Sequence, residues 1–256
     1  MDFSFEIVWK ILQSSWPSLL LGVQNTLLVA LSGTIIGLVI GLVVGGLKAI
    51  KVDESSSALV KTIKKIYDVI STVYIEVFRG TPMMVQAVFI YYSLLKVIKW
   101  SPLVAGIFVI SINTGAYMSE IIRSGIQSVD KGQTEAARSL GMSNIQTMMM
   151  VVIPQAIKNA FPAIGNEFIV NIKDSSVLSV IAITELMYQG NKIAGSVFRF
   201  PETFFIIACI YLVLTTITSF ILHLIEEKMN HTRTSFPHSD STSSSISLPR
   251  NGKRVK

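Results

Sequence analysis

The feature that most constrains the fold is an apolar run over residues 19–47 that contains no charged residue. A helix needs about 20 apolar residues to cross the hydrocarbon core of a bilayer, so this run is long enough to cross it and to tilt or protrude. Four more apolar runs follow, over about 81–99, 102–126, 162–183 and 203–225. Because backbone polar groups must be paired within lipid, such runs favour helices. The sequence therefore predicts an all-α integral membrane protein with five transmembrane helices.

The composition excludes several other classes of protein. Only 15% of the 256 residues are charged, whereas a soluble domain carries about 25%. The basic residues lie between the apolar runs rather than on one face, so the net charge of +6 does not indicate a nucleic-acid partner. The single Cys209 excludes an internal disulfide, and the three histidines lack metal-binding spacing. Since a phosphate-binding loop and a catalytic arrangement are also missing, we expect no metal site, no cofactor and no enzymatic activity in this chain.

The predicted transmembrane domain spans residues 19–228, and three segments of the chain lie outside the apolar runs. Residues 1–18 mix aromatic and polar side chains, which indicates an interfacial amphipathic N-terminus, and Pro17 suits the first turn of the helix that follows. Residues 48–79 predict a cytoplasmic turn and an amphipathic helix along the inner membrane surface. Residues 229–256 form a Ser-rich basic tail that we expect to be disordered.

The distribution of Lys and Arg predicts the orientation in the membrane. With the N-terminus outside and five spans, most basic residues fall on the inner side, as the positive-inside rule requires. This orientation places the loop 127–160 and the C-terminus in the cytoplasm.

A glycine stripe in the first span predicts a helix contact. Gly33, Gly37, Gly41 and Gly45 recur every four residues and so share one helical face. Small residues allow another backbone to approach closely. Packing within the subunit and packing at a dimer interface both remain open, and the former is favoured.

The third span carries polar side chains that are costly in lipid. Asn113, Tyr117 and Glu120 follow one another at spacings of four and three, so they share a face. An ionisable residue at this depth is a candidate functional residue. This face could line a solute path or a dimer interface. Alternatively, it forms a structural hydrogen-bond network between helices.

The fourth span is the most polar of the five. Asn166, Glu167, Lys173 and Asp174 all lie in it, and they must face protein or water rather than lipid. Lys173 and Asp174 either contact a charged or zwitterionic solute or form an internal ion pair that fixes the helix register.

The loop between the third and fourth spans has its own pattern. Glu135, Ala136 and Ala137 begin a stretch of helix formers that breaks at Gly141, and an apolar run then leads to Pro154. This pattern predicts a short helix, a turn and a second element that returns to the membrane. A helix outside the bilayer, anchored to spans at both ends, can transmit force from a soluble partner.

This loop resembles the EAA loop of ABC importer permeases, in which E-A-A is followed by three residues, G, nine residues, I-x-L and P. Val151 and Ile153 replace the family's Ile and Leu, and the other positions match. The segments R-G-T-P at 79–82, Q-x-x-F-x-Y-Y at 86–92 and K-D-S-S at 173–176 resemble those of polar amino acid permeases. The resemblance implies a type I ABC importer permease fold, located in a bacterial plasma membrane, that takes up polar amino acids.

The resemblance also implies partners and residue roles. ATP and Mg would bind separate ATPase subunits, coupled through Glu135, Ala136, Ala137, Gly141 and Pro154. A second permease subunit, identical or homologous, would complete the path. An extracellular or periplasmic binding protein would deliver the amino acid. Three alternatives remain. One is an ABC permease for another small solute such as an opine or peptide, and another is a stand-alone ion-coupled carrier in which intramembrane acids relay protons. The third is a membrane scaffold or sensor component that binds an ATPase without transport.

Overall fold

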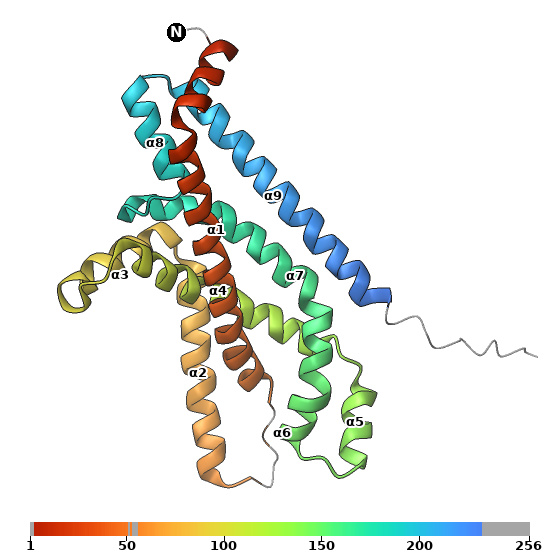
Figure 1. Cartoon of the computed structure of the whole chain (residues 1–256). Helices are drawn as coiled ribbons and strands as arrows, with labels where there is room; N and C mark the ends of the chain where they lie inside the picture. The colour runs from red at the N-terminus through yellow and green to blue at the C-terminus, as the bar shows by residue number, and fades with distance from the viewer. Residues whose placement is uncertain (1–2, 51, 53–55, 232–256) are drawn as a thin grey trace, which may run out of the picture.

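The computed structural model describes residues 3–50, 52 and 56–231, which fold entirely into helices and short connections (Figure 1). The elements are α1 (Phe5–Ala49), α2 (Ala58–Gly80), α3 (Met83–Ile98), α4 (Pro102–Gln127), α5 (Lys131–Ser139), α6 (Asn144–Thr147), the π-helical η1 (Met148–Val152), α7 (Ile153–Asp174), the 3-10 helix η2 (Ser175–Ile181), α8 (Leu186–Val197) and α9 (Phe200–His231). The all-α prediction is therefore confirmed for these residues. The predicted disordered tail lies outside the described residues from residue 232 onward.

The first helix is much longer than its apolar run. α1 has 45 residues, which corresponds to about 67 Å of helix. It passes through Pro17 without a break, so the prediction that this proline begins a helix was wrong. The N-terminal part of α1 packs on α8 and α9, where Ile11 and Leu19 join a buried cluster with Leu186 and Ile206. This packing compensates for the hydrogen bond that a proline removes from a helix interior.

The glycine stripe of α1 lies against α4. A Cβ atom added to each glycine would approach α4 closely: 2.6 Å from Ile110 Cγ2 at Gly33, 2.7 Å from Thr114 Cγ2 at Gly37, 2.4 Å from Met118 Cβ at Gly41 and 2.4 Å from the Ser119 carbonyl oxygen at Gly45. The favoured prediction, packing within the subunit, is therefore confirmed. The absence of side chains lets the two backbones form the centre of the molecule.

The segment after α1 forms the helix predicted there, α2, and this helix packs on the bundle. α2 runs beside the C-terminal half of α1 (Figure 1), and the Tyr67 and Tyr74 hydroxyls donate hydrogen bonds to the carbonyl oxygens of Val44 in α1 and Ile112 in α4, at 2.9 and 2.6 Å. α2 is therefore attached to both α1 and α4. α3 follows at an angle of 110° to α2. The chain turns because Pro82 holds an extended backbone just before α3.

Three of the described helices are long and apolar enough to cross a bilayer: α1, α4 and Phe200–Met229 of α9. α2 and α3 add a fourth if the bent pair is one span. α7 does not meet this criterion because of the polar residues already noted in it.

The fourth predicted span ends in an irregular segment. α7 gives way to η2, and Ala182 then adopts a left-handed backbone (φ 63°) before Glu185 caps α8. The Glu185 carboxylate is fully buried and accepts hydrogen bonds from the backbone N–H groups of Met187 and Tyr188 and from the Tyr211 hydroxyl, at 2.7–3.0 Å. Because all these donors come from α8 and α9, this carboxylate holds the segment in place.

Candidate functional site

The loop between α4 and α7 begins with a short capped helix. The Asp130 carboxylate accepts a hydrogen bond from the Gly132 backbone N–H at 2.7 Å, and α5 then runs to Ser139. Gly141 follows with a φ of +84°, a left-handed conformation that favours glycine. This turn lets the Met142 N–H donate to the Ala137 carbonyl oxygen at 3.2 Å, which closes the end of α5.

The second half of the loop returns directly to the membrane domain. Ser143 and Gln146 form a reciprocal capping box at the start of α6. The chain then continues without a break through η1 into α7, with the Ile153 N–H bonded to the Met148 carbonyl oxygen five residues earlier. Pro154, which has no N–H, follows this wider turn within the first positions of α7. The predicted pattern of helix, turn and returning element is confirmed.

The loop exposes apolar side chains. Ala137 is buried, whereas Glu135, Ala136, Gly141 and Pro154 are exposed. Leu140 is 84% exposed and Ile145 is 64% exposed, while Met149 and Met150 are also on the surface. α5 and α6 lie at the end of the molecule opposite α8 (Figure 1). Exposed apolar side chains grouped on a protruding element are typical of a protein-binding surface.

The three predicted residues of α4 share a face, and this face contacts α2 and α3. The Asn113 amide donates to the Phe78 carbonyl oxygen at 3.1 Å and to Gln86 Oε1 at 3.0 Å, and it is buried. Because both acceptors belong to this chain, Asn113 connects helices, as the structural interpretation expects.

Tyr117 and Glu120 lie in a charged cluster that also contains two arginines. The Arg123 guanidinium donates to both Glu120 oxygens, with Nη2–Oε2 at 2.7 Å and Nε–Oε1 at 3.1 Å. Arg79 Nη1 lies 4.0 Å from Glu120 Oε2, and its guanidinium lies over the Tyr117 ring at 5.4 Å from the centroid. The Glu120 and Arg79 side chains are 26% and 42% exposed. The cluster is therefore accessible from outside the subunit.

The fourth-span candidates do not form one constellation. Glu167 and Asp174 are half-buried, and the charges of Asp174 and Arg79 both act on Glu167, so these acids border the charged cluster. Asn166 is exposed and lines a different pocket, on the α9 side of α7. Lys173 is exposed, and the salt bridges of the described region do not include a Lys173–Asp174 pair. The predicted ion pair at this position is therefore not supported.

Two polar residues gained importance only from the structure. Asn171 is buried between three helices, accepting from the Thr114 hydroxyl of α4 at 3.0 Å and donating to the Thr34 hydroxyl of α1 at 2.8 Å. Arg79 connects α2 to Tyr117 and Glu120. In the sequence, Arg79 could have been noted because it belongs to the R-G-T-P segment. Asn171 could have been noted because it is a polar residue within a predicted span.

The sequence has relatives of known family along nearly its whole length. Residues 55–231 match the family described as binding-protein-dependent transport system inner membrane component. The chain is 35% identical over 232 residues to the glutamine transport system permease protein GlnP of Escherichia coli (strain K12), covering 90% of this chain and 99% of that protein. It is 33% identical over 228 residues to the probable amino-acid permease protein YxeN of Bacillus subtilis (strain 168), covering 88% and 96%.

Solved structures have the same fold. A chain from a crystal structure of an amino acid ABC transporter with histidines is 40% identical, with a TM-score of 0.75 and coverage of 89% of this chain and 100% of that one. A chain of the MetNI methionine ABC transporter in an inward-facing conformation is 19% identical, with a TM-score of 0.71 and coverage of 89% and 99%. At that identity, the second likeness concerns the fold alone.

Proposed function

The chain belongs to the family of inner membrane components of binding-protein-dependent transport systems, and we propose that it is the permease subunit through which an ABC importer takes up polar amino acids. The observation that carries the proposal is the match to amino acid permeases and to an amino acid ABC transporter over nearly the full length of each. The chain itself is not an enzyme, since in this family ATP hydrolysis lies in a separate subunit.

We propose five membrane crossings with the N-terminus outside and the C-terminus in the cytoplasm. The crossings are α1, α2 with α3, α4, α7 with η2, and α9. This assignment moves the second crossing from 81–99 to include α2, whose attachment to α1 and α4 supports it. The end of α1 lies on the same side as the α4–α7 loop, because Ala49 and Ile50 line one pocket with Glu135 and Asn144.

The loop would couple the spans to the ATPase. Its exposed Leu140 and Ile145 would enter a cleft of the partner, with ATP and Mg bound to that partner. Because α6, η1 and α7 form one continuous run, a movement of the loop would pass to α7. The Asn159 amide, which donates to the Ser128 hydroxyl at 2.9 Å, would carry the same movement to the end of α4.

The charged cluster around Glu120 would form part of the solute path. Arg79 offers a cation to the carboxylate of an amino acid, and Glu120, Glu167 and Asp174 offer anions to its ammonium group. A second permease subunit would close the open side of the cluster, and a binding protein would deliver the solute from outside. Asn166 lines a different pocket on the α9 side of α7 and Lys173 is exposed, so neither is assigned to this path.

Reconstitution in liposomes tests the function and the orientation together. Uptake of labelled glutamine should require the binding protein on one face and the ATPase with ATP and Mg on the other. In the variant Ser139→Cys, an impermeant thiol reagent should label the loop only from the ATPase face. Uptake by the permease alone would favour the ion-coupled carrier, and uptake of peptides or opines instead of amino acids would change the solute class.

The variant Glu120→Gln should separate a path residue from a structural one. We expect uptake to fall about tenfold or more, since a hydrogen bond to a charged group contributes about 1.5–3 kcal/mol. Basal ATP hydrolysis and co-purification with the ATPase should persist. Glu76→Gln, at an exposed position on α2, is the matched control and should transport normally. Loss of the assembled transporter in Glu120→Gln would instead indicate that the Arg79 and Arg123 contacts are structural.

A further inference from the structure

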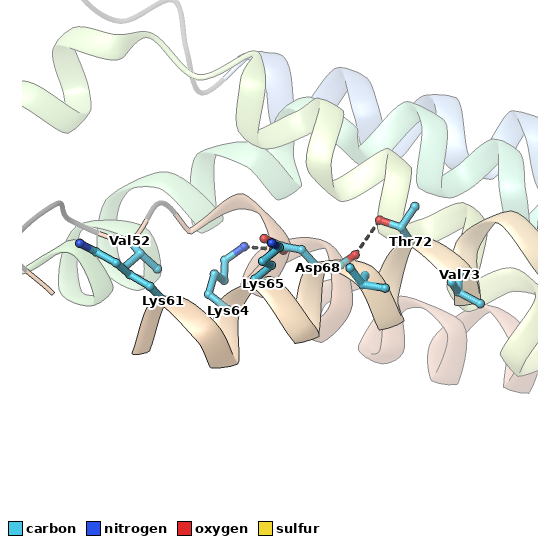
Figure 2. Close-up of a pocket in the computed structure, with 8 residues that line it drawn as sticks. Val52, Lys61, Lys64, Lys65, Asp68, Thr72 and Val73 are labelled. Carbon is cyan, nitrogen blue, oxygen red and sulfur yellow. Dashed lines mark hydrogen bonds and ion pairs between the residues drawn. The ribbon is translucent and has the colours of Figure 1, made fainter. Parts of the chain in front are cut away.

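A basic pocket lies where α1 ends and α2 begins. It has a volume of about 510 Å³ and is open on one side. Figure 2 shows Lys61, Lys64 and Lys65 along one stretch of α2, followed by Asp68. These residues belong neither to the α4–α7 loop, which would couple to the ATPase, nor to the charged cluster that would form the solute path.

The inner part of the pocket is held by hydrogen bonds. Lys64 pairs with Asp68, and its Nζ also donates to the Lys48 carbonyl oxygen at 3.3 Å. Lys48 Nζ donates to the Thr72 hydroxyl at 2.9 Å. The Lys64 side chain is only 20% exposed, so it is fixed in place. The carboxylate of Asp68, which also lines the pocket, is already paired with this lysine.

The mouth of the pocket is basic and its far wall is apolar. Lys61 and Lys65 are exposed at the mouth. Val69 and Val73 form the wall, and both are more than half exposed. This wall continues into the outward face of α2, which is apolar along its length through Leu59, Ile63, Ile66, Ile70 and Val77. A ligand that fits must be anionic at one end and apolar at the other.

We propose that this pocket binds the phosphate headgroup of an anionic phospholipid whose acyl chain lies along the apolar face of α2. The lipid would belong to the membrane leaflet on the side of the α4–α7 loop, and this assignment of the leaflet rests on the proposed orientation. Charge complementarity selects an anionic headgroup over a neutral one. Each lysine near an anionic lipid surface contributes roughly a fivefold gain in affinity, so Lys61 and Lys65 together account for roughly 30-fold.

Native mass spectrometry of the complete transporter tests the site. The permease with its ATPase is purified in a neutral detergent and titrated with phosphatidylglycerol, and the lipid adducts are counted. The double variant Lys61→Gln/Lys65→Gln should bind the tightest phosphatidylglycerol roughly 30-fold more weakly than the unchanged chain. The control Lys96→Gln/Lys99→Gln removes the same charge at exposed positions on the opposite side of the break between α2 and α3, and it should bind normally.

Further measurements exclude other occupants. Phosphatidylcholine should not replace phosphatidylglycerol, and millimolar inorganic phosphate should not compete with it. Equal binding of the neutral lipid, displacement by free phosphate, or equal loss in both double variants would each overturn the proposal. Binding of the lipid only when the ATPase is absent would also overturn the proposal, because the lysines would then contact an acidic surface of the ATPase. Because co-purification of the ATPase is recorded on the same samples, a failure of the coupling proposal would be recognised separately.

Discussion

Replacement of Gly45 by alanine should destabilise the folded chain by about 3 kcal/mol, at the upper end of the cost of overpacking a well-packed site. The added Cβ would lie 2.4 Å from the Ser119 carbonyl oxygen and 3.2 Å from the Ser119 Cα. These are backbone atoms of α4 and cannot rotate away, so α1 and α4 would have to separate. The result should appear as a fall of roughly 6–12 °C in the thermal midpoint of the purified transporter.

The neighbouring Gly46 provides a matched control. A Cβ at Gly46 would meet only Ile153 Cδ1, at 3.8 Å, which is an ordinary contact with the end of a flexible side chain. Gly46→Ala should therefore leave the midpoint unchanged or raise it, because alanine is about 1 kcal/mol more favourable than glycine inside a helix. Midpoints can be compared by heating both variants and measuring the remaining monodisperse fraction. Equal midpoints for the two variants would mean that α1 and α4 do not approach as closely as the glycine stripe implies.

The glycine stripe also shows how far the sequence predicts this fold. A spacing of four places Gly33 to Gly45 on one face and requires a close neighbour, but it does not identify that neighbour. The structure identifies the neighbour as α4, in which Ile110, Thr114, Met118 and Ser119 lie against the four glycines. Such a contact depends on two segments far apart in the chain, which local patterns do not encode.

Boundaries were predicted less well than element types. The proline rule placed a helix start at Pro17, but tertiary packing against α8 and α9 extends the helix through it. Charged residues lie between apolar ones in 48–79, which predicts an amphipathic helix along the inner membrane surface. The structure adds that polar residues of this helix, including Tyr67 and Tyr74, form hydrogen bonds to α1 and α4. A hydropathy scale counts such residues as polar, although their polar groups are paired by hydrogen bonds within the bundle.

The candidate site was predicted unevenly for the same reason. The loop motif is local, so its helix, its turn and its return at Pro154 followed from the order of residues. The charged cluster is not local, since Arg79 comes from α2 and Glu120 from α4. The carboxylate of Glu185 was missed because nothing in its neighbourhood indicates that it is buried against Tyr211. Sequence patterns therefore found the acids and amides of the spans, whereas their partners required the fold.

Replacement of Gly141 by aspartate should abolish coupling to the ATPase while leaving the permease folded. An added Cβ meets nothing within 4 Å in this chain, so the substitution costs only left-handed backbone strain. That strain is at most about 1–2 kcal/mol, and aspartate, like asparagine, tolerates this conformation better than other residues. In the docked transporter the same position would face the partner, and a buried, unpaired carboxylate would cost several kcal/mol. We expect uptake to fall by at least tenfold, measured with labelled amino acid in proteoliposomes, and capture of the ATPase on a tagged permease to fall with it.

Gly141→Asn separates the effect of the charge from that of the backbone. Asparagine has nearly the same size as aspartate and tolerates a left-handed conformation, but it is neutral. It should retain most of the uptake and most of the captured ATPase. Equal losses in the two variants would attribute the defect to strain in the turn, because the charge is then irrelevant. Normal uptake in Gly141→Asp would mean that this turn does not enter the partner, and the force would have to pass through the other exposed side chains of the loop, Leu140 and Ile145.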